Sequence, residues 1–125
     1  MLFRSIRDMS FPKLKRQLHG ELFHDSSSKD RAQRLAYATD ASVFQEMPRA
    51  VALPKDAHDL RTLIAFAQKQ GLTLIPRAAG TSLAGQVVGN GLVVDLSAHF
   101  TQILEVNVTE KWARVQPGEI GRAHV

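Results

Sequence analysis

The sequence predicts an α+β fold that contains a strand–helix–strand unit followed by further strands. The first strand is the apolar run Ala50–Leu53, which stops at Pro54 because proline lacks the N–H group that a sheet requires. An amphipathic helical pattern follows over residues 56–70, and a second apolar run, Leu72–Ile75, completes the unit. Such a unit places its two strands parallel through a right-handed crossover. The chain of 125 residues, 44% of them apolar, is long enough to bury the core of one small domain.

Residues 1–45 are predicted to form a helical segment ahead of this unit. Leucines recur every four residues within Pro12–Leu22, which is the spacing of a helix with one buried side. The short polar side chains of Asp25–Ser28 suit a helix start because they accept hydrogen bonds from unpaired N–H groups. They predict a second, short helix over Lys29–Tyr37, and an irregular stretch, Thr39–Ser42, follows it.

The helix of the central unit carries its own start and stop signals. Asp56 is the expected N-cap, and Asp59 stands three residues later in an arrangement similar to a capping box. Gly71 is the expected C′ residue, since glycine readily adopts the left-handed conformation that ends many helices. His58 falls on the polar side of this helix, where we interpret it as a solvated side chain rather than a catalytic one.

Three further strands are expected after the central unit. Asn90 and Gly91 supply the turn before the first of them, and Thr109–Lys111 is the turn of a hairpin formed by the other two. Asp95 lies in the first of these strands, where we expect it to cap a turn or bond neighbouring backbone. The predicted strands are Leu92–Leu96, Ile103–Val108 and Trp112–Gln116.

The stretch Pro76–Gly91 holds the most informative pattern, a run of small residues between two strands. Its glycines allow positive φ and let N–H groups turn toward one point. Thr81 and Ser82 add hydroxyl donors, and Arg77 adds a planar positive group, so the loop suits a phosphate or pyrophosphate. A structural turn without a ligand explains the glycine spacing alone equally well. The four glycines are Gly80, Gly85, Gly89 and Gly91.

Two familiar phosphate-binding motifs are excluded at this loop. Gly80 and Gly85 have the spacing of a P-loop, but Gln86 and Val87 stand where lysine and a hydroxyl residue are required. The dinucleotide-binding fingerprint needs three glycines that open a helix directly after a strand, and no spacing here supplies it.

The runs Pro76–Gln86 and Gly91–Ser97 together resemble the FAD-binding domain of the vanillyl-alcohol oxidase/p-cresol methylhydroxylase (PCMH) superfamily. Three flanking motifs agree with this resemblance: Tyr37–Ser42, Ala50–Pro54 and Ala113–Gly118. Within the superfamily the similarity is greatest to D-lactate dehydrogenases and the flavin subunit of glycolate oxidase. The resemblance implies that residues 46–118 are the first, truncated part of a PCMH-type domain, its pyrophosphate-binding subdomain.

One position departs from the family pattern. Many relatives have glycine where this chain has Ala78. Because alanine tolerates positive φ poorly, either Ala78 has ordinary dihedral angles here or the loop is slightly reshaped.

The resemblance implies an oxidoreductase that binds FAD and oxidises a D-2-hydroxy acid such as D-lactate or glycolate, with hydride transfer to the flavin N5. Thr81 and Ser82 stand where some members carry a flavin-linking histidine, so the FAD is expected to be non-covalent. The implied cofactor-binding residues are Pro76, Arg77, Ala78, Ala79, Gly80, Thr81, Ser82, Gly85 and Gln86.

The resemblance places the catalytic residues and the substrate-binding cap later in the chain, so no catalytic residue is assigned and no turnover is expected from this chain alone. It leaves open the electron acceptor and whether an iron–sulfur domain or subunit follows. Two alternatives remain open: a non-enzymatic module that binds a small anion or nucleotide, and another enzyme branch such as an alkyl-glycerone-phosphate synthase relative.

The composition limits which classes of binding partner are expected. The net charge is +4 and basic residues gather near the start, but only 6% of residues are aromatic and no nucleic-acid-binding motif appears, so nucleic acid is not an expected partner. No metal site is expected, and no cysteine is available for disulfides. No signal peptide or apolar run long enough to cross a membrane is evident. We expect a cytoplasmic protein, and the basic start leaves open a peripheral contact with the inner membrane.

Both ends of the chain match the translation of one DNA segment. Leu2–Ser5 can be encoded by CTC-TTC-CGA-TCT, and its reverse complement lies within one coding of Glu119–Val125. This segment is a common sequencing-library adapter. Our hypothesis is that residues 2–5 and 119–125 derive from an adapter and that the gene-derived part ends near Gly118. The nucleotide record tests it, because different codons at either end exclude this origin.

Overall fold

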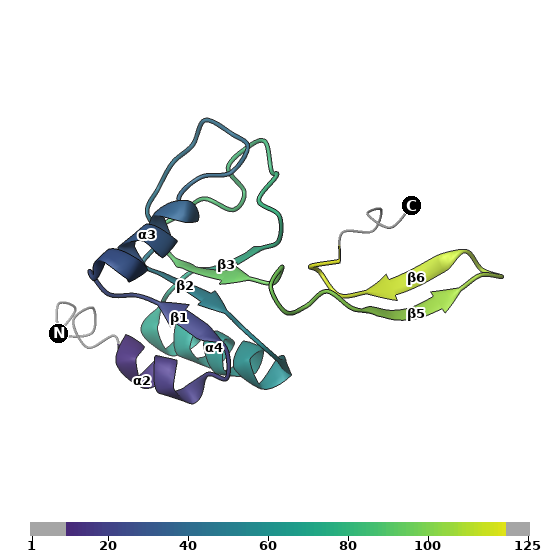
Figure 1. Ribbon diagram of the computed structural model, residues 1–125, viewed down its shortest axis with the longest axis horizontal. Helices are drawn as coiled ribbons and strands as arrows, with labels where there is room; N and C mark the ends of the chain where they lie inside the picture. Colours follow the sequence, from purple (N-terminus) through teal and green to yellow (C-terminus); the bar gives the residue numbers. More distant parts are fainter. Residues whose placement is uncertain (1–9, 120–125) are drawn as a thin grey trace.

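The computed structural model describes residues 10–119. These residues form a four-stranded sheet with helices on its faces and a separate two-stranded hairpin (Figure 1). The helices are α2 (Phe11–Gln17), α3 (Ser28–Ala36) and α4 (Ala57–Gln70). The strands are β1 (Glu21–Phe23), β2 (Ala50–Leu53), β3 (Leu74–Arg77), β4 (Leu92–Asp95), β5 (Ile103–Asn107) and β6 (Trp112–Val115).

The sheet has the strand order β1-β2-β4-β3. β2 and β3 both run parallel to β4, which confirms the parallel orientation predicted for the strand–helix–strand unit. β4 lies between them, so Val93 is paired with Val51 on one side and Ile75 on the other. β1 adds an antiparallel edge beside β2. The loop between β3 and β4 therefore joins two neighbouring parallel strands.

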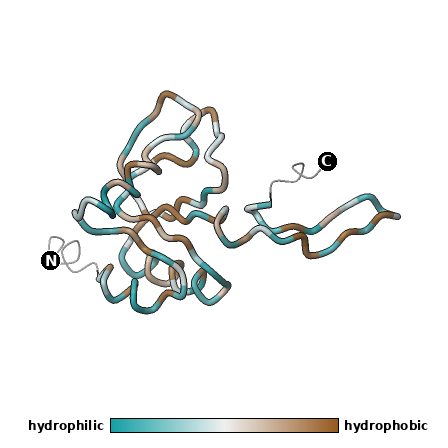
Figure 2. Tube along the Cα trace, viewed as in Figure 1, coloured by the Kyte–Doolittle hydropathy of each residue, from teal (hydrophilic) through white to brown (hydrophobic). Residues whose placement is uncertain are grey.

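Alternate residues of the central strands face two different cores, as the period of a strand requires. Figure 2 shows apolar colouring along these strands, as well as in parts of the loops and the hairpin. One face packs against α2 and α4, and the opposite face is covered by Tyr37 and by Val87 of the glycine loop. The first core contains Leu14, Leu18, Leu22, Ala50, Ala52, Leu63, Leu92 and Val94. The second core contains Phe23, Val51, Ile75 and Val93.

The central helix begins and ends as predicted. The Asp56 side chain accepts a hydrogen bond of 3.0 Å from the Asp59 amide, and Gly71 ends α4 in the left-handed conformation with φ 67°. The Asp59 carboxylate does not complete a capping box with Asp56. It accepts hydrogen bonds from the amides of His19 (2.9 Å), Gly20 (2.8 Å) and Lys55 (2.9 Å) instead. This buried carboxylate therefore ties the α2–β1 connection to the start of α4.

The predicted helix over residues 12–22 is wrong in its second half. α2 ends at Gln17, and Leu22 lies in β1, where it pairs with Ala52. The chain turns at Gly20, where an added Cβ would lie only 2.0 Å from the carbonyl oxygen of Leu53. Helix and strand here deliver leucines to the same core, so the four-residue spacing is no proof of one continuous helix.

Other predicted boundaries differ by one or two residues. The strand expected at 72–75 lies at Leu74–Arg77, and the hairpin strands end one residue earlier than expected. Of residues 2–5 and 119–125, for which we proposed an adapter origin, only Glu119 lies within the described residues. Within residues 10–119, no helix has the length and apolar character needed to cross a bilayer.

Candidate cofactor-binding site

The glycine loop, residues 78–91, leaves the end of β3 and lies on the sheet face opposite α2 and α4 (Figure 1). Two of its glycines have positive φ, +68° at Gly80 and +78° at Gly85. Among the described non-glycine residues only Lys111 has positive φ, so Ala78 has ordinary dihedral angles. The family departure at Ala78 thus needs no strained backbone.

A second segment, residues 37–44, holds the glycine loop from the side, and we call it the clasp segment. The Ser82 hydroxyl donates a hydrogen bond of 2.6 Å to Asp40 Oδ2, and the Ala41 amide donates one of 3.1 Å to the Ser82 carbonyl. The Ser42 hydroxyl and amide both donate to Asp40 Oδ1. The hydrogen bonds from Ser42 and then Ser82 lower the pKa of Asp40 to about 2. Asp40 is therefore a carboxylate at neutral pH and fixes Ser82.

Arg77 joins the same two segments. Its guanidinium donates hydrogen bonds to the carbonyl oxygens of Thr39 (2.7 Å) and Tyr37 (3.4 Å) and lies 5.2 Å from the centre of the Tyr37 ring. A Cβ added at Gly80 would lie 2.4 Å from Arg77 Nη2. The arginine charge that the sequence assigned to phosphate binding thus lies beside Gly80, while its hydrogen bonds hold the clasp segment.

Tyr37 and Asp95 anchor the clasp segment to the sheet. The Tyr37 hydroxyl donates a hydrogen bond of 2.5 Å to Asp95 Oδ2 at the end of β4. Asp95 Oδ1 accepts from the Ser97 amide (2.8 Å) and hydroxyl (2.6 Å), which confirms the backbone-bonding role predicted for Asp95. Burial and the neighbouring Asp95 carboxylate raise the pKa of the Tyr37 hydroxyl above its ordinary value, so it remains a donor.

The far end of the loop packs against the clasp segment through Phe44. A Cβ at Gly85 would lie 2.8 Å from the Phe44 ring, so glycine is required there both for φ and for space. Phe44 itself is exposed. Val43, the residue before it, and Leu83 of the glycine loop are also exposed. The Gln86 side chain closes the loop internally by accepting a hydrogen bond of 3.1 Å from the Ala84 amide.

The first part of the glycine loop is suited to hold an anion. Within residues 10–119, the amides of Ala79–Leu83 donate no hydrogen bond to another described residue. When contacts with a neighbouring segment restrain a loop but leave its amide N–H groups without acceptors, those groups can bind phosphate oxygens. The Ser82 hydroxyl proton is already committed to Asp40, which differs from its predicted role as a phosphate donor. Thr81 is exposed, and its role as a phosphate donor stays a prediction.

A comparison with known protein families identifies the domain that contains this glycine loop. The sequence profile of the FAD binding domain matches residues 48–123 of this chain. The chain belongs to this family of FAD-binding domains. Its cofactor is therefore FAD, and the loop with its positive-φ glycines and uncommitted amides fits the pyrophosphate of that dinucleotide.

The curated relatives similar to this chain include D-2-hydroxyglutarate dehydrogenases and glycolate oxidase subunits. A D-2-hydroxyglutarate dehydrogenase of Pseudomonas putida is 40% identical over 114 residues, which are 89% of this chain and 11% of the relative. One from Haemophilus influenzae is 41% identical over 78% of this chain and 10% of the relative. Glycolate oxidase subunit GlcD of Bacillus subtilis is 36% identical over 80% of this chain and 21% of the relative. The chain thus spans about a tenth of the first relatives' length.

Solved structures confirm the PCMH-type fold. An alkyldihydroxyacetonephosphate synthase is similar with a TM-score of 0.64 over 96% of this chain and 23% of its own, at 18% identity. A carbohydrate oxidase from Microdochium nivale gives the same TM-score over 86% of this chain and 23% of its own, at 17% identity. At these identities the similarity concerns the fold alone, so it does not favour the synthase branch kept open above.

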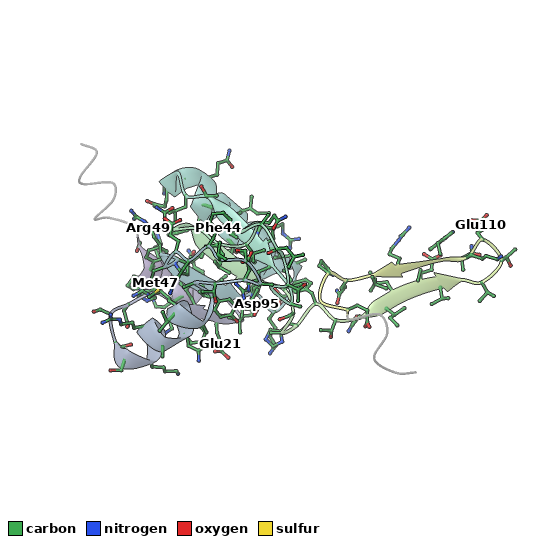
Figure 3. The ribbon with its side chains drawn as sticks, turned by 90° about the horizontal axis from the view of Figure 1, so that it is seen from above. Glu21, Phe44, Met47, Arg49, Asp95 and Glu110 are labelled. Carbon is green, nitrogen blue, oxygen red and sulfur yellow. The ribbon has the colours of Figure 1, made fainter. Side chains whose placement is uncertain are left out.

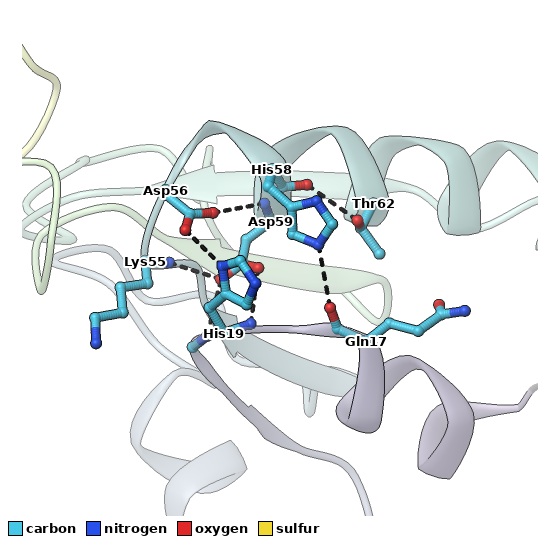
Figure 4. A network of polar contacts seen from close by, with 8 residues as sticks. Gln17, His19, Lys55, Asp56, His58, Asp59 and Thr62 are labelled. Atoms are coloured by element: carbon cyan, nitrogen blue, oxygen red, sulfur yellow. Dashed lines mark hydrogen bonds and ion pairs between the residues drawn. The ribbon is translucent and has the colours of Figure 1, made fainter.

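A second polar cluster lies away from the loop, where the α2–β1 connection meets α4 (Figure 4). His19 Nδ1 lies 2.6 Å from Asp56 Oδ2, and the His19 ring stacks on His58 with centroids 4.6 Å apart. The carboxylate of neighbouring Asp59 accepts hydrogen bonds from three backbone amides. We assign this cluster a structural role, and His58 is exposed as predicted.

Proposed function

We propose that this chain forms the pyrophosphate-binding part of an FAD-dependent dehydrogenase that oxidises a D-2-hydroxy acid. The observation that carries the proposal is the geometry of the glycine loop, whose uncommitted amides at Ala79–Leu83 are held in place by Asp40 and Arg77. The names of the relatives support the redox class, since they are D-2-hydroxyglutarate dehydrogenases and glycolate oxidase subunits.

D-2-hydroxyglutarate is the substrate we favour for the complete protein. Two relatives of about 40% identity carry that name, others that carry it are 33% and 34% identical, and the glycolate oxidase subunit GlcD of Bacillus subtilis is 36% identical. D-lactate and glycolate, suggested by the sequence motifs, become the comparison substrates. All of these acids share a hydroxyl group on the carbon next to a carboxylate, so one redox chemistry serves them.

In this mechanism the chain's residues bind and orient, and they perform no chemical step. The amides of Ala79–Leu83 would donate to the phosphate oxygens, which would compensate for the water those charges lose on binding. Arg77 lies beside Gly80 and adds positive charge near them. When bound, FAD supplies the two-electron redox chemistry. Thr81 and Ser82 provide no histidine for a covalent link, which supports a dissociable cofactor.

The remaining machinery is proposed to lie in the rest of the complete protein. That portion would supply the other side of the FAD cradle, the substrate cap, the catalytic base and the route to the electron acceptor. We therefore expect no measurable turnover from the 125-residue chain, and only weak FAD binding.

The test uses the protein expressed from the complete gene. We expect a yellow protein whose flavin absorbance bleaches under anaerobic conditions with D-2-hydroxyglutarate, more slowly with D-lactate or glycolate, and not with L-2-hydroxyglutarate. A protein that retains FAD but is bleached by none of the D-2-hydroxy acids contradicts the substrate class. A purified, folded protein without flavin supports the non-enzymatic module instead.

A further inference from the structure

The hairpin β5–β6 extends away from the four-stranded sheet, and no other element lies against it in either view (Figures 1 and 3). Every residue of both strands is exposed except Asn107, which is half-buried. An isolated two-stranded hairpin is at best marginally stable in water. The polarity of its two faces therefore indicates whether each face remains in water or is covered.

One face of the hairpin is polar and internally paired. The pairs Glu105–Arg114 and Asn107–Trp112 lie on this face, because directly opposed residues of antiparallel strands share a face. Arg114 Nη1 lies 3.9 Å from Glu105 Oε2, and its guanidinium lies 5.9 Å from the centre of the Trp112 ring. The Trp112 indole N–H donates a hydrogen bond of 3.0 Å to Glu110. These contacts suit a face that remains in water.

The opposite face is apolar and uncovered. The pairs Ile103–Val115 and Val106–Ala113 form it, and all four residues are exposed. The exposed fractions are 56% for Ile103, 62% for Val106 and 47% for Val115. Contiguous exposed aliphatic side chains opposite a polar face are typical of a surface that another layer covers.

The apolar surface does not stop at the hairpin. Phe100 and Pro117, which flank the hairpin in sequence, line a hollow whose other walls come from α4 and the ends of β3 and β4. Ile64, Pro76 and Leu96 also line it, and Ile64 is exposed on α4. Every side chain lining this hollow is apolar. An occupant of the hairpin face would therefore meet further apolar surface at the hairpin's base.

We propose that the apolar face of β5–β6 is the docking surface for the part of the same polypeptide that follows this hairpin in the complete protein. The first curated relatives are about ten times longer than the matched region, and the similar solved structures are about four times longer. The family profile matches to residue 123, past the end of β6 at Val115, so the matched domain does not end with the hairpin. The inference rests on the longer flavoprotein proposed above, but it requires neither its substrate nor bound FAD.

Cysteine labelling can test this surface, because the chain contains no cysteine. Val106→Cys places a thiol on the apolar face, and Glu105→Cys places one on the neighbouring position of the polar face. Maleimide labelling is followed by peptide mass spectrometry in the 125-residue chain and in the complete protein. We expect both thiols to react readily in the chain. In the complete protein, Val106→Cys should react at least about tenfold more slowly, while Glu105→Cys changes by less than about threefold.

Unchanged labelling of Val106→Cys in the complete protein overturns the proposal, and protection of both thiols overturns its single-faced form. Slow labelling in the 125-residue chain that recovers on dilution identifies a second copy as the occupant, which also contradicts it. Hydroxyl-radical footprinting of the unsubstituted proteins reads the same surface if a variant fails to fold. Flavin content is measured in parallel, so protection in a flavin-free protein supports docking while contradicting the proposed function.

Discussion

The hydroxyl of Ser82 donates a hydrogen bond of 2.6 Å to the carboxylate of Asp40, 42 residues earlier in the chain. With the Arg77 contacts to Tyr37 and Thr39, this bond joins the glycine loop to the clasp segment. These contacts restrain the part of the loop that carries the amides of Ala79–Leu83. Preorganisation of this kind reduces the entropy lost when a ligand binds.

Asp40→Asn is expected to weaken FAD binding to the complete protein. The asparagine side chain keeps one acceptor oxygen but lacks the negative charge of the carboxylate to which the Ser82 and Ser42 hydroxyls donate. We expect the FAD dissociation constant to rise by roughly three- to tenfold, with little change in thermal stability. Asp25→Asn is the matched control, since Asp25 accepts from Ser27 in a turn remote from the loop in sequence. Equal FAD dissociation constants for the two variants contradict the role of Asp40.

Flavin release by acid should follow the titration of Asp40. Its pKa is lowered from the ordinary 3.8 to about 2, because the hydroxyls of Ser42 and then Ser82 donate to the carboxylate. The stabilisation of the folded site by the Asp40 carboxylate is therefore complete above pH 3.8 and is lost as the pH falls through about 2. Fluorescence of released FAD should show that the difference between wild type and Asp40→Asn persists at pH 5 and narrows below about pH 3. A difference that disappears by pH 5 contradicts this assignment.

His19 should titrate above its ordinary value. Its hydrogen bond and ionic attraction to Asp56 raise the pKa above 6.5, with Asp59 adding to the rise and Lys55 opposing it. The stabilisation is fully present below pH 6.5 and is lost as the pH rises through the folded-state pKa. NMR titration of the chain should place the His19 midpoint above 6.5, and Asp56→Asn should lower it. A His19 midpoint below 6.5 excludes the pairing.

Asp59→Asn is expected to destabilise the chain strongly. Burial raises the pKa of Asp59, but the amide hydrogen bonds outweigh this and keep the carboxylate ionised. The variant turns an NH₂ group toward at least one buried amide donor, which costs roughly 1–3 kcal/mol in free energy of unfolding. Urea denaturation measures the loss. Asp56→Asn, which alters a half-buried carboxylate on the same helix start, should cost less, and the reverse order contradicts the proposed role of Asp59.

Local signals predicted the parts of the fold that depend on neighbouring residues. Asp56 and Gly71 marked the ends of α4 correctly, because capping depends on side-chain chemistry and backbone freedom within a few residues. The small residues between Pro76 and Gly91 marked the loop for the same reason. Ala50–Leu53 was predicted to the residue, since Pro54 ends it.

Contacts between distant residues could not be predicted in this way. Leu22 fits a helical spacing, and only its pairing with Ala52 makes it part of a strand. The insertion of β4 between β2 and β3 is set by tertiary packing. Asp40 lies within the family motif Tyr37–Ser42, but nothing local indicates that its carboxylate bonds Ser82 rather than capping a turn. Likewise, Arg77 carries no sign that its donors reach Thr39.

The central claim is that the amides beside Gly80 hold the FAD pyrophosphate. The most direct measurement is the ratio of FAD to protein in the purified complete protein carrying Gly80→Val, compared with Gly71→Val. Both glycines have positive φ, but a Cβ at Gly71 meets nothing within 4 Å, whereas at Gly80 it meets Arg77. We predict that Gly80→Val loses at least about nine tenths of its FAD while Gly71→Val retains it. Equal FAD content in the two folded variants would contradict the account.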